Sequence, residues 1–315
     1  MYPRDVIASP KCEQNLKAQI PHLVSRNPHR NSMIIDSHQH FWKFGHSFGP
    51  KFEEGSVLNR DFLPADIKPL RDGCGVQRTI AVQAVGSVDE TRWLLQLAKK
   101  SAYIAGVVGW VDLTSPDVGQ TLDELMIDPR LRGVRHLVES EADPDWLVRE
   151  DVIRGLQEVA QRGLTYDLLV RPHHLKHAVT LAERLPDLRM VVDHLAKPSH
   201  DAATIDQWSR DLAAVASFPS IYCKLSGMIT EAPDGHWKPS DFKPLVETVV
   251  ELFGDDRIMF GSDWPVCSLA GTYIDAYVVL VQALRPISPE RFAKIFGRNA
   301  QDFYELTDME YFISP

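Results

Sequence analysis

Two histidines separated by one residue, His38 and His40, stand at the end of a short apolar stretch and are the first candidates for chemistry. In an extended strand alternate side chains share a face, so both imidazoles should point one way and Gln39 the other. Two imidazoles on one face can share a divalent cation. The pair therefore predicts part of a metal site, with hydrogen bonding inside the core as the alternative in a chain that has 12 histidines.

Two further apolar stretches, far along the chain, also end in ligand-type side chains, His194 and Asp263. Asp263 could bridge a metal and a water molecule and accept the proton of that water as general base. His194 could bind the metal or hydrogen-bond a developing oxyanion. We therefore expect hydrolysis, with Asp263 and His194 catalytic and with the metal ligands His38, His40, His194 and Asp263. The alternatives are a capping role for Asp263 and a satisfied core pair of Asp193 with His194.

Charged and aromatic residues near other strand ends are candidates for holding substrate. Lys224 lies within an apolar stretch, and because an unpaired buried ammonium is costly, we expect it to take part in catalysis by holding anionic oxygen. Arg135 and Arg171 could bind substrate in the same way or only join loops. Large rings near a barrel mouth could stack on the C–H faces of a sugar or simply pack. The candidates of this kind are Trp42, Trp110 and Trp264.

The elements that must position these residues alternate between apolar and amphipathic stretches. Eight such pairs follow one another over about 270 residues, near the usual length of a (β/α)8 barrel. The apolar stretches are continuous, as a parallel sheet covered on both faces requires. No G-x-G-x-x-G turn follows the first one, which leaves an open dinucleotide-binding sheet without support. The sequence therefore predicts the α/β class and a single (β/α)8 TIM barrel.

The predicted strands end at the candidate residues and cover residues 33–35 before the histidine pair, 79–84, 104–110, 133–138, 166–170, 190–193, 221–225 and 258–260. The predicted helices cover about 61–72, 90–101, 118–126, 151–162, 174–184, 203–216, 242–253, 272–284 and 289–296. Chemistry in such a barrel occurs at the C-terminal ends of the strands, so residues far apart in sequence should converge there.

Composition and charge restrict the classes of partner that this protein is expected to bind. The 315 residues carry a formal net charge of −9, which argues against a nucleic acid or an anionic membrane. No apolar run approaches the roughly 20 residues that span a bilayer. The four scattered cysteines predict reduced thiols and a cytoplasmic protein. Residues 1–32 are basic and rich in proline without an apolar signal core, so we expect a flexible extension before a domain at 33–315. The oligomeric state stays open.

Six stretches resemble the metal-dependent hydrolases of the amidohydrolase superfamily, in particular the lactonase branch that includes L-fuconolactonase and L-rhamnonolactonase. These stretches are residues 35–42, 60–64, 133–136, 192–198, 223–227 and 260–265. The resemblance spans nearly all of the chain after Met33. It implies an eight-stranded barrel, hydrolytic opening of a lactone ring, and a central constellation of His38, His40, His194 and Asp263.

The resemblance also bears on the metal. Binuclear members of the superfamily place a carboxylated lysine or glutamate on strand four and a histidine on strand five. Here Arg171 ends strand five and Glu139 alone could serve near strand four, which implies one divalent ion. We expect this ion to be zinc. Related lactonases that act on pyrone dicarboxylates use no metal, so a metal-free reaction is the alternative.

The expected reaction is attack of water on the carbonyl of a small-molecule sugar-acid lactone, with Asp263 as general base. A neutral lactone rich in hydroxyls would suit the tryptophans, whereas a dicarboxylate lactone of aromatic catabolism would use Arg135, Arg171 and Lys224. A decarboxylase of the same superfamily shares the histidine and aspartate set and would release carbon dioxide from an aromatic carboxylate. A barrel that only binds is the weakest hypothesis, because binding does not need these four groups together.

Overall fold

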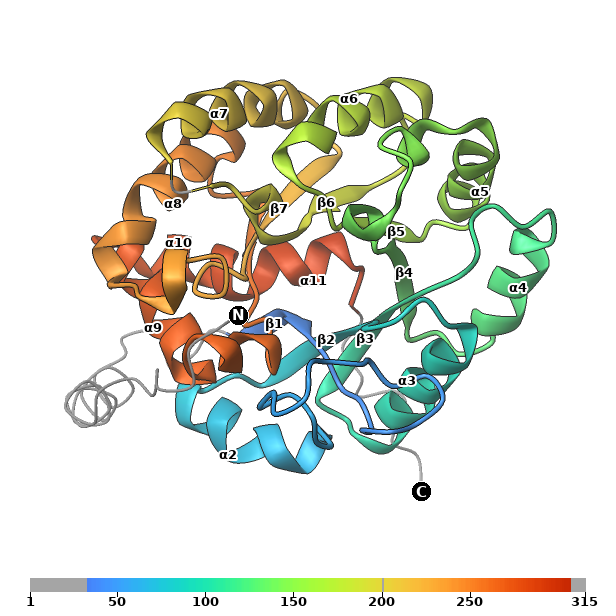
Figure 1. Ribbon diagram of the computed structural model, residues 1–315, viewed down its shortest axis with the longest axis horizontal. Helices are drawn as coiled ribbons and strands as arrows, with labels where there is room; N and C mark the ends of the chain where they lie inside the picture. The colour runs from blue at the N-terminus through green and yellow to red at the C-terminus, as the bar shows by residue number, and fades with distance from the viewer. Residues whose placement is uncertain (1–32, 200, 307–315) are drawn as a thin grey trace.

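The barrel predicted from the sequence is confirmed (Figure 1). The computed structural model describes residues 33–306 except His200, so the predicted extension at 1–32 lies outside the described residues. Eight parallel strands form one sheet in the order β1 to β8. Two backbone hydrogen bonds, from His40 N to Trp264 O (2.7 Å) and from Asp263 N to His38 O (2.9 Å), join the end of β1 to the segment after β8. These bonds bring the two edges of the sheet together.

The strands are short and mostly buried, as the continuous apolar stretches predicted. They are β1 Ile35–Gln39, β2 Arg78–Val82, β3 Ile104–Gly109, β4 Leu131–His136, β5 Thr165–Leu168, β6 Met190–Val192, β7 Ile221–Leu225 and β8 Ile258–Phe260. The helices are α2 Pro64–Cys74, α3 Val88–Lys100, α4 Val118–Leu125, α5 Glu150–Gln161, α6 Leu175–Arg184, α7 Ala202–Ala216, α8 Pro239–Phe253, α9 Tyr273–Ala283, α10 Pro289–Ala293 and α11 Asn299–Phe303.

Two predicted elements differ in ways that matter for the site. The sixth strand ends at Val192 and not at Asp193, which begins a short 3-10 turn. The last predicted helix, at 289–296, is interrupted by a π-helical turn over Lys294–Arg298 and continues as α11. The turn brings Gly297 against the backbone of Met33, where a Cβ atom would lie 2.1 Å from the carbonyl oxygen. This close approach is tertiary, so the period of the sequence could not reveal it.

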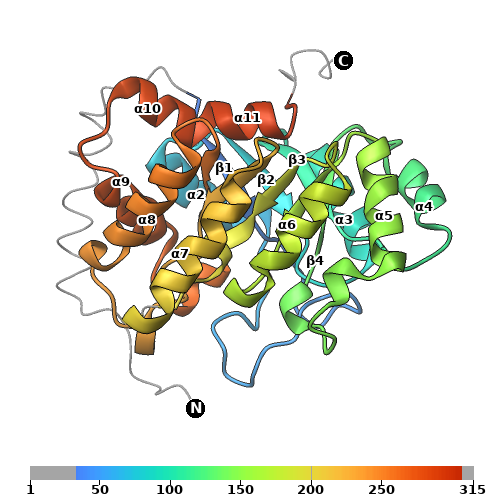
Figure 2. The same cartoon turned by 90° about the horizontal axis from the view of Figure 1, so that it is seen from above.

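Helix α11 covers the end of the barrel at which the strands begin. Phe303 and Tyr304 belong to a core cluster that also contains Ile35 and Val191 of the strands. Arg189, which precedes β6, donates a hydrogen bond to the Phe303 carbonyl oxygen at 2.9 Å. Figure 2 shows α11 at one end of the barrel and the long loop after β1 at the other. The C-terminal ends of the strands are thus the open end.

The cysteines that the structure describes, Cys74, Cys223 and Cys267, are buried free thiols, as the sequence predicted. Within residues 33–306 no helix is both long enough and apolar enough to cross a bilayer.

Candidate active site

The two histidines of the first strand face the same side, as predicted, and their Nε2 atoms are 3.2 Å apart. Gln39, between them, donates its amide to the carboxylate of Asp36 at 2.8 Å. The Nδ1 atom of His40 lies 2.9 Å from the carbonyl oxygen of Val82. A carbonyl oxygen only accepts, so Nδ1 of His40 carries the hydrogen and Nε2 of the neutral ring presents a lone pair to the site.

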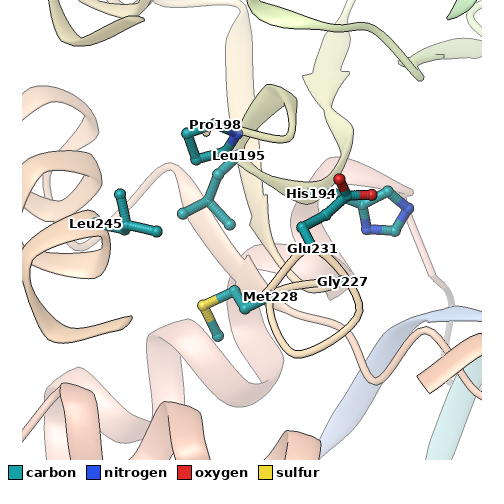
Figure 3. A pocket seen from close by; sticks show the side chains of 7 residues that line it. All are labelled: His194, Leu195, Pro198, Gly227, Met228, Glu231 and Leu245. Atoms are coloured by element: carbon teal, nitrogen blue, oxygen red, sulfur yellow. The ribbon is translucent and has the colours of Figure 1, made fainter. Parts of the chain in front are cut away.

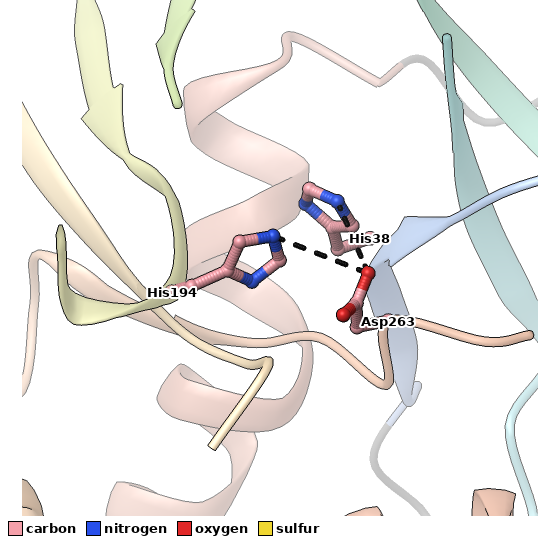
Figure 4. Close-up of side chains that lie close together, drawn as sticks. All are labelled: His38, His194 and Asp263. Carbon is pink, nitrogen blue, oxygen red and sulfur yellow. Dashed lines mark ion pairs between the residues drawn. The ribbon is translucent and has the colours of Figure 1, made fainter. Parts of the chain in front are cut away.

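Asp263 brings a carboxylate to this pair from the opposite edge of the sheet. Its backbone has φ of +57°, a left-handed conformation that Asp and Asn tolerate better than most residues. The carboxylate oxygen Oδ1 lies 3.3 Å from Nε2 of His40, 3.7 Å from Nε2 of His38 and 4.0 Å from Nε2 of His194. Figure 4 shows His38, on β1, and His194, in the turn after β6, converging on this oxygen.

Four successive residues after β6, His194–Lys197, have φ between +50° and +58°. In a continuing strand Asp193 and His194 would point to opposite faces. The left-handed turn instead lets both side chains approach His38: the carboxylate of Asp193 lies 3.4 Å from Nδ1 of His38, and the ring centroids of His38 and His194 are 4.5 Å apart. Trp208 supports the turn by donating to the Leu195 carbonyl oxygen at 2.8 Å.

The orientation of His194 is fixed from β7. Its Nδ1 atom is 2.8 Å from the hydroxyl oxygen of Ser226. Gly227, next in the chain, has φ of +65°, and a Cβ atom on it would lie 2.6 Å from Nδ1 of His194. The absence of a side chain at Gly227 therefore lets the imidazole lie flat against the backbone with Nε2 turned toward Asp263.

Burial and neighbouring charge set the protonation states. Burial would raise the pKa of Asp263, but the imidazoles of His194, His40 and His38 outweigh it and hold that pKa well below its usual range. Burial lowers the pKa of His194, and the carboxylates of Asp263 and Asp193 only partly oppose it. Burial likewise holds the pKa of His38 well below its ordinary value. At neutral pH the carboxylate of Asp263 is thus ionised and the rings of His38 and His194 are neutral.

The residues fit a single divalent ion. One atom each of His38, His194 and Asp263 lies within 4.8 Å of the others, and Nε2 of His40 faces two of the three. Imidazole nitrogen together with carboxylate oxygen is a donor set that suits zinc. Asp193 contacts the outer nitrogen of His38, where metal-binding histidines commonly meet a carboxylate.

Lys224 and Arg135, both expected to meet substrate, contact different nitrogens of the His38 ring. The ammonium of Lys224 contacts Asp167 at 2.5 Å, Asp193 at 3.0 Å and Nδ1 of His38 at 3.2 Å. The guanidinium of Arg135 donates to Asp193 at 3.1 Å, and its Nη1 lies 3.2 Å from Nε2 of His38. The positive charges of Lys224 and Arg135 are thus balanced within the barrel by the carboxylates of Asp167 and Asp193. The charge of Lys224 is already compensated there.

Trp42 and Trp264 do not lie at the rim where a sugar could stack. They are 1% and 2% exposed, and each ring packs edge-on against Phe62, with centroids 5.1 Å and 5.3 Å apart. The cause is an antiparallel bridge between Trp42 and Phe62, which folds the loop after β1 back over both rings. Burial of these rings in the core corrects the expectation that they face the substrate.

Trp110, in contrast, is half-buried just beyond β3. Its indole donates to Nδ1 of His136 at 3.0 Å, and Nε2 of that histidine lies 2.6 Å from the Glu141 carboxylate. The His136 ring is stacked on Trp146 at a centroid distance of 3.9 Å. Trp110 is therefore held in one orientation near the ends of β3 and β4.

Arg171 belongs to a network of four ion-paired residues at the open end of the barrel. It contacts Glu139 at 3.1 Å and Glu231 at 3.3 Å, and Lys197 contacts the same two carboxylates at 2.7 Å and 3.5 Å. The Arg171 side chain is 43% exposed. Glu139 is thus engaged by two cations of the protein, and the expectation of one metal ion stays a prediction.

A small cavity adjoins this network. In Figure 3 the carboxylate of Glu231 lies beside the imidazole of His194, while apolar side chains form the opposite wall. The lining residues are His194, Leu195, Pro198, Gly227, Met228, Glu231 and Leu245.

Sequence reasoning missed three residues of the site. Asp193 was considered only as a core partner, although it contacts His38, Arg135 and Lys224. Asp167 lies within an apolar strand, the same signal that drew attention to Lys224. Tyr304, which donates to Asp167, carries no signal in the sequence because it reaches the site only through the docking of α11.

Comparison with known proteins agrees with this geometry. The amidohydrolase family profile matches residues 35–306. The chain is 37% identical over 279 residues to an L-fucono-1,5-lactonase of Burkholderia ambifaria, covering 86% of this chain and 95% of that protein. It is 36% identical over 293 residues to an L-fucono-1,5-lactonase of Burkholderia multivorans, covering 88% and 97%. A crystal structure of an amidohydrolase from Burkholderia multivorans with bound zinc superimposes with a TM-score of 0.83 at 34% identity, covering 88% of this chain and 100% of that one.

Proposed function

This chain belongs to the amidohydrolase family and is a hydrolase of ester bonds, and from that premise we propose that it opens the ring of a sugar-acid lactone. The proposed substrate class is a 1,5-lactone of a 6-deoxy aldonic acid such as L-fuconic acid. Two relatives that carry this activity in their names each match more than four fifths of the chain. L-Rhamnonolactone is the next substrate to consider, because a yeast L-rhamnono-gamma-lactonase matches 44% of the chain at 27% identity.

The observation that carries the proposal is a buried carboxylate surrounded by three imidazoles. Asp263 is 4% exposed and has three imidazoles within 4.0 Å. A carboxylate that is ionised at neutral pH and fixed in position can act as a general base toward a water molecule. Hydrolysis of an ester needs that base and a stabiliser for the oxyanion. We propose His194 for the second role in the metal-free reaction, in which its Nε2 carries the hydrogen, whereas with zinc bound the same nitrogen is a ligand.

In the proposed reaction Asp263 removes a proton from water as the water oxygen bonds to the lactone carbonyl carbon. The carbonyl oxygen gains negative charge beside His194, whose Ser226 hydrogen bond keeps the ring in place. The bond between this carbon and the ring oxygen then breaks, and the proton held by Asp263 passes to the departing oxygen. The product is the open hydroxy acid, and the Asp263 carboxylate is again ionised.

We propose His38, His40, His194 and Asp263 as the ligands of one zinc ion. Such an ion, when bound, polarises a carbonyl oxygen and lowers the pKa of water toward about 7. Arg135 offers positive charge at the same place, since its Nη1 is 3.2 Å from Nε2 of His38. This contact is the specific observation that favours the metal-free alternative, in which Arg135 compensates the converging lone pairs.

The test of the function is acid release from a panel of aldonolactones at neutral pH, measured with a pH indicator before and after chelation. We expect turnover of L-fucono-1,5-lactone and related 6-deoxy lactones, loss of activity on chelation, and its return with zinc. Activity that survives chelation would contradict the metal and favour the Arg135 arrangement. No turnover of any lactone, together with carbon dioxide release from aromatic carboxylates, would replace the lactonase by the decarboxylase.

Substrate binding is proposed for Trp110 and Arg171, the predicted binding residues that remain accessible. Replacing Arg171 by Gln should raise KM about tenfold and leave kcat unchanged, since a hydrogen bond between this cation and substrate oxygen is worth about 1.5 kcal/mol or more and acts equally in ground and transition state. Steady-state kinetics on the best lactone of the panel measures both constants.

The matched control for Arg171 is Arg184, which is 40% exposed and pairs with Glu150 at 2.8 Å. Arg184→Gln removes a comparable surface ion pair away from the barrel mouth and should leave KM as it is. An unchanged KM in both variants would show that Arg171 only joins loops.

A further inference from the structure

The network of side chains that contacts His38 extends beyond the candidate active site toward the other end of the barrel. Lys224 is fully buried on β7, and its ammonium contacts Asp167 on β5, Asp193 after β6 and Nδ1 of His38 on β1. A buried ammonium is costly unless its hydrogen bonds are satisfied. Here the carboxylates of Asp167 and Asp193 accept hydrogen bonds from the ammonium, and the ring of His38 lies against it, so the position of Lys224 is tied to all three residues.

The network ends on the helix that covers the other end of the barrel. The hydroxyl of Tyr304, just after α11, donates to the carboxylate of Asp167, with distances of 2.9 Å and 3.1 Å to its two oxygens. The ammonium of Lys224 also lies 5.6 Å from the centroid of the Tyr304 ring, within the range of a cation–π contact. Tyr304 thus touches both members of the Lys224–Asp167 pair.

We propose that Tyr304 and Asp167 are positioning residues for the reaction, which act through Lys224 and Asp193 to keep Nε2 of His38 directed at Asp263. The chain of contacts is continuous: Tyr304 hydroxyl to Asp167, Asp167 to the Lys224 ammonium, Lys224 to Asp193 and to the imidazole. Without Asp167 the ammonium would be drawn wholly to Asp193, the carboxylate that also holds Arg135 and His38.

A purely stabilising role is a poor explanation for this arrangement. Buried ion pairs often contribute less to stability than well-packed apolar side chains of the same volume, because desolvation offsets their attraction. What they supply is a defined geometry, since each charged group has few satisfying positions. In this barrel Lys224 and Arg135 pair with the carboxylates of Asp167 and Asp193. The imidazole of His38 then takes its orientation from these paired groups.

The test compares Tyr304→Phe and Asp167→Asn with Tyr166→Phe. Tyr166, on the same strand as Asp167, is also fully buried, and among the described residues its hydroxyl has no hydrogen-bond partner. The control therefore removes the same atom from a buried tyrosine without removing a hydrogen bond of the network. In each variant we would measure kcat, KM, the melting temperature and the nitrogen-15 resonances of His38, the last on chelated protein without substrate and assigned with His38→Gln.

We expect kcat to fall about 10-fold in Tyr304→Phe and about 100-fold in Asp167→Asn, with KM nearly unchanged, as for residues that orient a ligand or catalytic histidine through a hydrogen bond. The His38 resonances should shift in both variants and not in Tyr166→Phe. Unchanged His38 resonances in Tyr304→Phe, with only a lower melting temperature, would overturn the proposal. If Asp167→Asn does not fold, Tyr304→Phe decides.

Of the two kinds of measurement in this test, only the kinetic constants depend on the proposed lactonase function. The resonances are recorded without lactone and without metal, so failure of the lactonase assignment would leave that half of the test intact. A shift of His38 in the variant proteins with no lactone turned over by the parent protein would refute the function and not the positioning network.

Discussion

Replacement of Asp263 by Asn should lower kcat about 10³-fold, within the 10²–10⁴-fold range that general-base catalysis contributes. The amide has the shape of the carboxylate, and Asn tolerates the φ of +57° at this position. The backbone hydrogen bonds that join the strand edges are retained, so the barrel should fold as before. What is lost is the group that accepts the proton of water. Stopped indicator assays on purified protein, with circular dichroism to establish the fold, measure the effect.

The matched control is Asp201→Asn. Asp201 caps α7 by accepting a hydrogen bond from Ala203 N at 3.1 Å and is exposed, and Asn is an equally good N-cap residue. This variant loses the same charge and should keep full activity. If Asp263→Asn retained more than about a tenth of the parent kcat, a role for Asp263 as general base would be refuted.

Replacement of Gly227 by Ala should lower kcat about 100-fold, because the new methyl group displaces the ring of His194 and of no other residue of the site. The new methyl group would lie 2.6 Å from Nδ1 of His194, too close for any carbon–nitrogen contact. The neighbour is a ring held by Ser226 on one side and by the left-handed turn on the other, so it can yield only by turning away from Asp263. A displacement of about 1 Å in a reacting group costs about 10²-fold in rate.

Backbone strain must be separated from this displacement. Gly163 has φ of +68°, close to the +65° of Gly227, but a Cβ atom there would meet no atom within 4 Å. Gly163→Ala and Gly227→Ala should therefore share a loss of about 1–2 kcal/mol in the free energy of unfolding, since both place a side chain in the left-handed region. Only Gly227→Ala should lose activity. Equal kcat values in the two variants would show that catalysis does not depend on the position of the His194 ring.

Much of the site could be derived from the sequence because it lies on strand ends. Continuous apolar stretches define parallel strands, and in a barrel their C-terminal ends meet. The period of two then puts His38 and His40 on one face, and their Nε2 atoms are indeed 3.2 Å apart. Asp263 and His194 were found in the same way, as polar residues that terminate apolar stretches. These inferences need only local geometry and one rule of architecture.

The tertiary structure decided which candidates face the substrate and which lie inside. Lys224 and Arg135 were expected to meet substrate; both contact His38 within the barrel, where Asp167 and Asp193 neutralise them. Trp42 was expected at the rim and is buried, because a loop folds back over it. The charge pairs join residues more than fifty positions apart, and the loop closure joins Trp42 to Phe62 across a loop without regular structure. No local period encodes such contacts.

Two features could not have been read from any stretch of the chain. The left-handed turn at His194–Lys197 turns two adjacent side chains toward the same imidazole, against the alternation of a strand, and is held by Trp208, Ser226 and Glu139 from other elements. Tyr304 reaches Asp167 only because a π-helical turn and Gly297 let α11 dock. The sequence by itself determined the barrel and the chemical identity of its central groups. Their orientation was decided by packing, because an imidazole or a carboxylate turns to whichever partners the folded chain places around it.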